Sequence, residues 1–218
     1  RELIYDICES ASGQRFHSSY TRVGGVLYDV TTAWVDKVRS FCKGFRAVHA
    51  EVDGLLTRNR IFIDRTKGVG VLSKEDAINF SCTGPIARAS GVVRDLRKDE
   101  PYLAYPDFDF KVICTNGGDC YARYLVRMHE MLESIKIIEQ AIENIPAGPI
   151  NVDPEGKAVL PNKSNMYQSI EGLIHHFEVI MPNRGFPTPT ESIYAATESP
   201  NGELGFYITA DSTSKPYR

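Results

Sequence analysis

The sequence has few cysteines, and none of them has the spacing that a metal site or a disulfide framework needs. The five are an odd number without a Cys-x-x-Cys pair: Cys8, Cys42, Cys82, Cys114 and Cys120. This pattern argues against a zinc knuckle or an iron–sulfur cluster held by this stretch, and it favours a reducing compartment. A disulfide between Cys114 and Cys120 stays open as the less favoured alternative, because only these two are close in sequence.

The sequence also lacks an excess of charge and any long apolar run. Its 25 Lys and Arg residues stand against 28 Asp and Glu residues, which gives a formal net charge of −3. That balance argues against a nucleic-acid partner, whose phosphates need a concentrated basic face. No apolar run approaches the roughly 20 residues of a membrane-spanning helix. The opening residues, RELIYDICES, are charged and predict a helix rather than a signal peptide.

The motifs of common catalytic sites are missing as well. There is no Gly-x-Ser-x-Gly sequence, and the stretches GVG and NGGD are too short for a phosphate-binding loop. His175 and His176 are adjacent, so on a helix their side chains point about 100° apart and do not face one metal ion. The residues alone therefore predict no metal site and no catalytic constellation.

Two long apolar stripes dominate what the sequence does contain. Residues 29–57 and residues 119–145 place apolar side chains at steps of three and four. Each stripe predicts a long helix, and two such helices bury their apolar faces most simply in an antiparallel bundle. Asp29 is the expected cap of the first helix, and Gly44 is a weak point inside it that costs about 1 kcal/mol relative to alanine. A proline and a glycine just after the second stripe are expected to end that helix.

The stretch between the long helices predicts shorter elements. Residues 59–72 alternate too weakly for a confident strand, and their glycines indicate a turn. Residues 73–80 open with a serine three positions before an aspartate, which is typical of a capped short helix. Residues 83–91 predict another short helix, with Thr83 as its cap, a proline in its first turn and a glycine at its exit.

The C-terminal third changes character twice. Residues 146–163 are rich in proline and glycine and predict an exposed linker. Residues 164–181 carry an apolar stripe that predicts one helix, and two β-prone runs around positions 200–202 predict a hairpin. We therefore expect a mainly α-helical fold with a long-helix region (1–145), the linker, and a helix with a hairpin (164–218). Both ends look cut, so we expect the whole chain to be one fragment of a larger subunit.

Five stretches together resemble one protein family. They are RFHSSYTRVGG (15–25), LLTRNRIFIDRTKGVGVLSKEDAINFSCTGPIARASGVVRDLRKDEPYLAY (55–105), GDCYARYLVRMHEMLESIKII (118–138), SIEGLIHHF (169–177) and ESPNGELGFYITADSTSKPYR (198–218). In combination they resemble the D subunit, the 49 kDa type, of the proton-translocating NADH:quinone oxidoreductase, respiratory complex I. The last stretch also resembles the Glu-x-Pro-x-Gly segment of nickel–iron hydrogenase large subunits. The resemblance covers essentially the whole chain and implies a hydrogenase-large-subunit-like helical bundle.

The resemblance implies a part in a large enzyme rather than an activity of this chain alone. The family's enzyme transfers electrons from NADH through FMN and iron–sulfur centres to a membrane quinone, coupled to proton translocation. Its D subunit binds no cofactor and walls the quinone cavity beside the terminal cluster of a smaller partner, near other peripheral-arm subunits and membrane subunits. This implies a peripheral position on the cytoplasmic face of the inner membrane or on the matrix side. The family's quinone ligands, a histidine and a tyrosine, precede Arg1, so no catalytic residue is assigned and the isolated fragment is expected to be inactive.

The stretch RFHSSYTRVGG resembles the family segment that lies near the partner's cluster. The matching histidine couples reduction of that cluster to proton uptake, which implies this role for His17, and an imidazole with a pKa near 6.5 suits it. Arg22 matches an arginine whose fixed charge favours the reduced cluster. Gly24 and Gly25 would let the backbone turn below the site. Val23 stands where many relatives have proline, so this turn is expected to be less rigid. A capping or surface role for His17 is the alternative.

Four charged residues are further candidates for contact with partner subunits: Arg88, Arg94, Asp211 and Arg218. The two at 88 and 94 belong to a basic cluster with Arg97 and Lys98, which nearby aspartates and a glutamate dilute. That mixture favours a solvated or interfacial charge network over an anion site.

Two other functions stay open at this point. The chain could be a purely structural scaffold whose partners carry all the chemistry. It could also belong to a membrane-bound nickel–iron hydrogenase relative, which would require two Cys-x-x-Cys pairs outside the present sequence.

Overall fold

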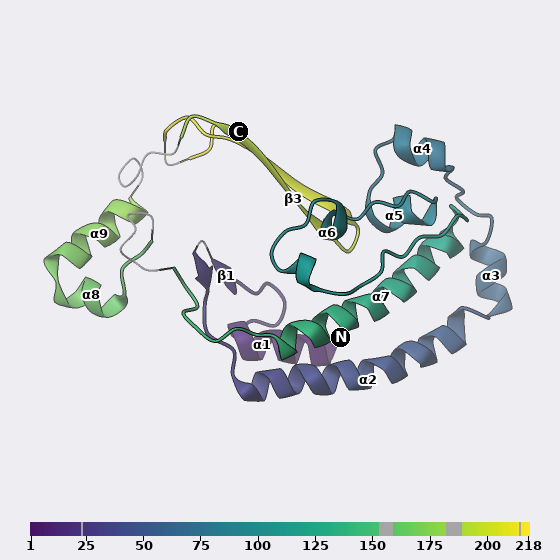
Figure 1. The fold of residues 1–218 in the computed structure, drawn as a ribbon, viewed down its shortest axis with the longest axis horizontal. Coiled ribbons are helices and arrows are strands. Elements are labelled where there is room, and N and C mark those ends of the chain that lie inside the picture. The colour runs from purple at the N-terminus through teal and green to yellow at the C-terminus, as the bar shows by residue number, and fades with distance from the viewer. Residues whose placement is uncertain (23, 153–158, 182–188, 214) are drawn as a thin grey trace. The chain divides into compact units, whose positions relative to one another are not determined.

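A computed structural model describes residues 1–22, 24–152, 159–181, 189–213 and 215–218 (Figure 1). The fold is mainly α-helical, and strands β3 (Ser192–Ser199) and β4 (Gly202–Thr209) form the expected C-terminal hairpin. The predicted fold class is therefore confirmed. The described helices are α1 (Glu2–Ser12), α2 (Thr32–Leu56), α3 (Arg60–Thr66), α4 (Lys74–Asn79), α5 (Gly84–Ala89), α6 (Leu96–Asp99), the 3-10 helix η1 (Tyr105–Asp107), α7 (Cys120–Glu143), α8 (Lys163–Gln168) and α9 (Ile170–Ile180).

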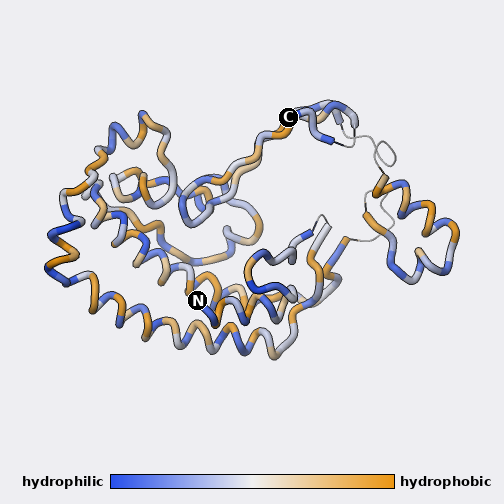
Figure 2. The backbone as a smooth tube through the Cα atoms, turned by 180° about the vertical axis from the view of Figure 1, so that it is seen from behind, coloured by the Kyte–Doolittle hydropathy of each residue, from blue (hydrophilic) through white to orange (hydrophobic). Residues whose placement is uncertain are grey.

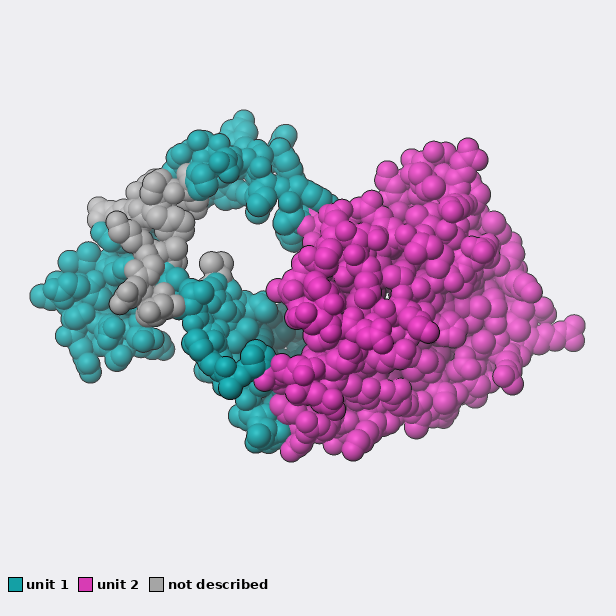
Figure 3. All heavy atoms as spheres, in the orientation of Figure 1, with its two compact units in different colours: residues 1–34, 146–195, 206–218 teal, residues 35–145, 196–205 magenta. Residues whose placement is uncertain are grey.

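The chain forms two compact units that do not follow chain order (Figure 3). Unit 1 comprises residues 1–34, 146–195 and 206–218, and unit 2 comprises residues 35–145 and 196–205. The turn of the β3–β4 hairpin therefore belongs to unit 2, whereas the far ends of both strands belong to unit 1.

Helix α7 and nearly all of α2 are the two long helices of unit 2, and they run antiparallel. Arg46 on α2 pairs with Glu139 at 2.6 Å, and three residues further along α2 the ring of His49 bonds the carbonyl of Met128 at 2.9 Å. Higher residue numbers on α2 thus face lower residue numbers on α7. The two helices are therefore antiparallel, as the apolar stripes predicted. Apolar and polar residues alternate along both helices (Figure 2). The buried apolar side chains of α7 are Ala122, Val126, Met128, Ile135 and Ile142.

The start of α2 differs from the sequence prediction. The helix begins at Thr32, and the hydroxyl of Thr31 accepts a hydrogen bond from the N–H of Trp34 at 3.2 Å. The carboxylate of Asp29 accepts instead from the N–H of Val30 at 2.8 Å. The predicted Asp29 cap is wrong, because a threonine two residues later lies closer to the first free N–H groups of the helix.

Asp119 sets the start of α7 and ties it to an earlier turn. One carboxylate oxygen accepts from the N–H of Ala122 and the other from the N–H of Gly68, both at 2.7 Å. Burial would raise the pKa of Asp119, but these two backbone donors outweigh it and hold the pKa below the ordinary value. A single side chain therefore caps the longest helix of the C-terminal half and fixes the loop after α3.

The short helices between α2 and α7 follow their caps. For residues 59–72 the sequence indicated a turn and gave too weak an alternation for a strand. The structure has α3 there, because Asn59 accepts hydrogen bonds from the N–H groups of Ile61 and Phe62. The predicted serine cap of α4 is confirmed, since Ser73 accepts from the N–H of Asp76 at 3.0 Å. Local capping decides these helices where the apolar period is too short to do so.

The sequence predicted one helix over residues 164–181, and this is wrong in one respect. The structure has two helices there, α8 and α9. Ser169 has an extended backbone between α8 and α9, and its hydroxyl accepts from the N–H of Gly172 at 3.0 Å while donating to the carbonyl of Asn165. A Cβ on Gly172 would overlap that same carbonyl. The chain therefore breaks the helix at Ser169 and folds α9 back against α8.

The predicted linker is only partly inside the described residues, and positions 153–158 lie outside them. In the described part, Asn151 forms a β-bridge with Gly25. The five cysteines are free thiols, so the Cys114–Cys120 disulfide is not formed. Across the described ranges, no helix combines the length and the apolar character that crossing a membrane requires.

Candidate functional site

The first candidate site is the loop that follows α1, residues 13–20, which we call the His17 loop. Helix α1 ends at Ser12, and Gly13 adopts a left-handed backbone with φ of 76° while donating its N–H to the carbonyl of Glu9. Arg15 then reaches back over α1 and pairs with three acidic side chains at 2.7–2.8 Å: Glu2, Asp6 and Glu9. These exposed ion pairs connect the loop to α1.

His17 belongs to this loop and is exposed to solvent. Its ring packs edge-on against the ring of Phe16 with centroids 4.6 Å apart, and Phe16 in turn lies 5.9 Å from the ring of Tyr5. Within the described residues, no hydrogen bond or ion pair to the His17 imidazole is found, and the residue lies beyond the helix end that Gly13 caps. Both ring nitrogens are therefore open to an external group.

Gly24 and Gly25 are required by the backbone that follows. Strand β1 (Thr21–Arg22) pairs with β2 (Gly25–Val26), and the segment at 150–152 runs alongside, with the N–H of Val26 bonding the carbonyl of Ile150 at 3.1 Å. Gly24 has φ of 93°, and a Cβ on Gly25 would overlap the backbone at Ile150. Arg22 is exposed at the end of β1. Position 23, the predicted departure from proline, lies outside the described residues.

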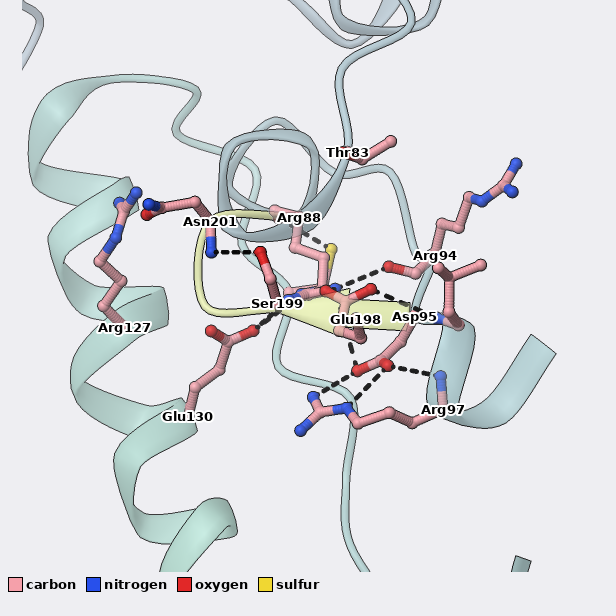
Figure 4. A network of polar contacts seen from close by, with 12 residues as sticks. Thr83, Arg88, Arg94, Asp95, Arg97, Arg127, Glu130, Glu198, Ser199 and Asn201 are labelled. Carbon is pink, nitrogen blue, oxygen red and sulfur yellow. Dashed lines mark hydrogen bonds and ion pairs between the residues drawn. The ribbon is translucent and has the colours of Figure 1, made fainter. Parts of the chain in front are cut away.

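The second candidate site is a buried group of charges in unit 2, which we call the Arg88 cluster (Figure 4). It comprises Arg88 on α5, Asp95 and Arg97 at the start of α6, Glu130 on α7 and Glu198 at the end of β3. Arg88 is only 1% exposed. Its guanidinium bonds Glu130 at 2.7 Å and Glu198 at 2.9 Å, and it lies 3.8 Å from Asp95.

Asp95 and Arg97 complete the cluster through a two-pronged ion pair. The guanidinium of Arg97 bonds the two carboxylate oxygens of Asp95 at 2.9 and 2.6 Å, and the backbone N–H of Arg97 donates to the same carboxylate. Burial would raise the pKa of Asp95, but the hydrogen bonds and charge of Arg97 outweigh it and hold the pKa below the ordinary value. This pair therefore stays ionised at neutral pH.

The cluster lies directly under the turn of the β3–β4 hairpin. The N–H of Glu198 donates to the hydroxyl of Tyr102 at 3.0 Å, and the N–H of Glu203 donates to the hydroxyl of Thr83 at 3.0 Å. Thr83 stands at the predicted cap position of α5, yet its side chain makes no hydrogen bond to that helix. Its hydroxyl accepts the hydrogen bond from the hairpin residue Glu203 instead. Gly84 and Gly202 touch backbone to backbone, so a Cβ on either would overlap the other segment.

The remaining predicted contact residues lie at different places. Arg94 is half-exposed at the edge of the Arg88 cluster and makes long ion pairs, 3.6–3.7 Å, with Glu100 and Glu203. Asp211 is exposed in unit 1, where bonds from Thr213 lower its pKa. Arg218 exchanges backbone bonds with Thr209 at the end of β4. The contacts of Arg88 are internal to this chain, whereas partner contacts of the other three stay predictions.

A cavity of about 580 Å³ between α2 and α7 offers no reactive pair of side chains. Its wall carries both signs of charge, for example Lys43 and Glu143, and its one thiol belongs to Cys42. Burial raises the pKa of the Cys42 thiol, which disfavours the nucleophilic thiolate. Over the described residues, no group of three or more His, Cys, Asp or Glu side chains is arranged to hold a metal ion.

Sequence reasoning placed Arg88 and Arg97 in one charge network with nearby aspartates, but it missed the two glutamates of the Arg88 cluster. Glu130 and Glu198 lie 42 and 110 positions from Arg88, so no local pattern connects them. The one available signal was Glu198, because it opens the ESPNGELG stretch that carried part of the family resemblance.

Comparison with known proteins gives one consistent result. The model of the family described as respiratory-chain NADH dehydrogenase, 49 kDa subunit, matches residues 1–218. The D subunit of the NADH-quinone oxidoreductase of Methylacidiphilum infernorum is 47% identical over the whole chain, which covers 51% of that relative. The corresponding values are 46% and 52% for the D subunit of Myxococcus xanthus, and 45% and 54% for the D 2 subunit of Sinorhizobium medicae. The chain therefore spans about half the length of these curated relatives.

Proposed function

The chain belongs to the family of the 49 kDa subunit of respiratory-chain NADH dehydrogenase, and from that premise we propose that it is part of an NADH:quinone oxidoreductase. In that enzyme, electrons pass from NADH through FMN and iron–sulfur centres to a membrane quinone, and their transfer is coupled to proton translocation. The present chain contributes to the wall of the quinone cavity beside the terminal cluster of a partner. The observation that carries the proposal is the match of residues 1–218 to one family, together with relatives that share one name.

The side chains of this chain support a cluster held by a partner rather than by the chain itself. Iron–sulfur clusters are bound mainly by sets of cysteine thiolates. The free thiols lie apart on separate elements, as with Cys8 on α1 and Cys42 on α2, and the described residues offer no metal-binding group. As part of this proposal, partner subunits hold the enzyme's redox groups and attach it to the membrane, and this subunit is peripheral to the membrane.

His17 is the residue of this chain that acts on the partner's cluster. Its imidazole is exposed, it rests on Phe16, and the ion pairs of Arg15 hold the loop that carries it. An imidazole takes up a proton near neutral pH when a neighbouring centre becomes more negative, because the added charge raises its proton affinity. Arg22 supplies a fixed positive charge nearby in the sequence and favours the reduced centre electrostatically. The partner's cluster supplies the electron that this proton accompanies.

The test is His17→Met in the assembled enzyme, with the midpoint potential of the terminal cluster measured against pH. A potential coupled to one proton falls by about 59 mV per pH unit, since a tenfold change in a one-electron equilibrium corresponds to 59 mV. We expect this dependence in the wild type and its loss in His17→Met. His129→Met is the matched control, because that histidine is also exposed but lies on α7. An unchanged pH dependence in His17→Met would remove the assignment and leave a scaffolding role.

A further inference from the structure

The Arg88 cluster contains more buried carboxylates than guanidinium groups. Its three carboxylates, from Asp95, Glu130 and Glu198, face the two guanidinium groups of Arg88 and Arg97. When every group is ionised, the cluster therefore has one excess negative charge. An uncompensated buried charge is costly, and a carboxylate in that position relieves the cost by taking up a proton.

Glu130 is the carboxylate best suited to hold that proton. Asp95 and Glu198 each accept a backbone N–H as well as a guanidinium, whereas the donors to Glu130 among the described residues are two nitrogens of Arg88. The Glu130 side chain is also 18% exposed, against 6% for Glu198 and 1% for Asp95. Among the three carboxylates, Glu130 is thus the one without a backbone donor in the described residues and the one with the best access to solvent.

We propose that the Arg88 cluster binds one exchangeable proton on Glu130, and that this proton strengthens the attachment of the β3–β4 turn to α5. The reason is that Glu130 and Glu198 share one guanidinium (Figure 4). When Glu130 is ionised, Arg88 divides its charge between both carboxylates. When Glu130 is neutral, the guanidinium of Arg88 forms a stronger ion pair with Glu198, which belongs to the hairpin. The proton comes from solvent and returns to it, with no other bond made or broken.

The surroundings of Glu130 agree with this exchange. Charged groups face it from each neighbouring element: Arg88 on α5, Asp95 and Arg97 on α6, and Glu198 on β3, while Arg127 on its own helix bonds a backbone carbonyl. Burial raises the pKa of Glu130 above its ordinary value, and the charge of Arg88 lowers it by less. A carboxyl with a raised folded-state pKa adds stability that is fully present below its unfolded pKa and is lost as pH rises through the folded pKa. The hairpin turn is therefore held more tightly at mildly acidic pH.

Hydrogen exchange of two backbone amides measures the attachment of the turn. The N–H groups of Glu198 and Glu203 bond Tyr102 and Thr83, so both exchange faster when the turn leaves α5. In the 218-residue chain we expect their protection factors, corrected for intrinsic exchange, to rise about three- to tenfold from about pH 7.5 to about pH 5. One unit of pKa linked to attachment corresponds to a factor of ten. In Glu130→Gln, a neutral mimic, protection should stay high at both pH values.

Two further measurements make the outcome decisive. Glu143→Gln removes an exposed carboxyl from the end of the same helix, so it should keep the wild-type pH dependence. A titration of the ¹³C-labelled glutamate carboxyls should contain one resonance, absent in Glu130→Gln, that titrates above the others. A flat wild-type profile, a profile unaltered in Glu130→Gln, or a Glu130 resonance that titrates with the exposed glutamates overturns the proposal. These experiments involve no partner and no electron transfer, so they are independent of the proposed function.

Discussion

At the scale of single residues, Arg88 is a buried arginine whose guanidinium is bonded on several sides. The guanidinium of Arg88 bonds Glu130, Glu198 and the carbonyl of Arg94, and within the described residues no buried side-chain nitrogen or oxygen lacks a partner. A buried ion cluster of this kind adds little over apolar packing while it is intact. Breaking it by removing one member is costly, because the remaining charges stay buried without compensation.

Arg88→Met therefore tests the cluster directly. Methionine fills a similar unbranched volume but leaves the carboxylates of Glu130 and Glu198 without their guanidinium. We expect the free energy of unfolding to fall by about 3–5 kcal/mol, measured by urea denaturation at neutral pH. Arg60→Met is the control, because Arg60 is exposed and its pair with Asp64 is 3.6 Å long, so its loss should stay within about 0.5 kcal/mol. Equal losses in the two variants would contradict a structural role for the cluster.

Single-residue predictions from the sequence succeeded only where the cause was local. The cap at Ser73 depends on a neighbour three positions away, and the sequence predicted it. Thr83 stands at the predicted cap position of α5 but bonds the N–H of Glu203, and Arg88 bonds Glu198. Such long-range partners are set by the fold and not by spacing, so sequence patterns place the residue on its helix without revealing its contacts.

At the scale of elements, two glycines allow the hairpin turn to rest on the start of α5. Gly84 has φ of 64° and Gly202 has φ of 132°, and the two backbones are in direct contact. A Cβ on Gly202 would overlap the hydroxyl and backbone of Thr83. The same contact brings the N–H of Glu203 to Thr83, so backbone packing and hydrogen bonding depend on one another at this point.

Gly202→Ala should therefore push the turn off α5. We expect a loss of about 1–3 kcal/mol in the free energy of unfolding from overpacking, and faster exchange of the Glu203 amide than of amides in α7. The control is Gly44→Ala in the middle of α2, where an added Cβ meets no atom within 4 Å. That change should stabilise the helix by about 0.5–1 kcal/mol. If both variants shifted stability in the same direction, the close approach at Gly202 would not be what holds the turn.

Element boundaries show where periodicity is sufficient and where it is not. The stripes at 29–57 and 119–145 are long enough that α2 and α7 follow from them with shifts of a few residues. The stripe at 164–181 is also continuous, yet the hydroxyl of Ser169 and the lack of a side chain on Gly172 make a break more favourable than one straight helix. Hydropathy does not register a side chain that competes for a backbone N–H.

At the scale of the whole molecule, the chain leaves a large amount of apolar surface uncovered. Helix α9 has no buried residue, and its apolar side chains are well exposed, among them Ile174 at 53% and Phe177 at 48%. Soluble monomers rarely leave such a stripe in contact with water. The chain also spans about half the length of its curated relatives. The sequence predicted the mainly α-helical class, whereas the division into two units depends on contacts between distant segments.

The exposed face of α9 should therefore drive self-association of the 218-residue chain. In the double variant Ile174→Gln and Phe177→Gln, each substitution removes an apolar side chain that is about half exposed. Burying the exposed half of each side chain contributes about 1 kcal/mol to the free energy of association. The dimer dissociation constant should then rise at least about 30-fold, since 1.4 kcal/mol corresponds to a factor of ten, as measured by sedimentation equilibrium over a range of concentrations. Glu178→Gln leaves the apolar stripe intact and should associate like the wild type. Association that persists in the double variant would assign it to another surface.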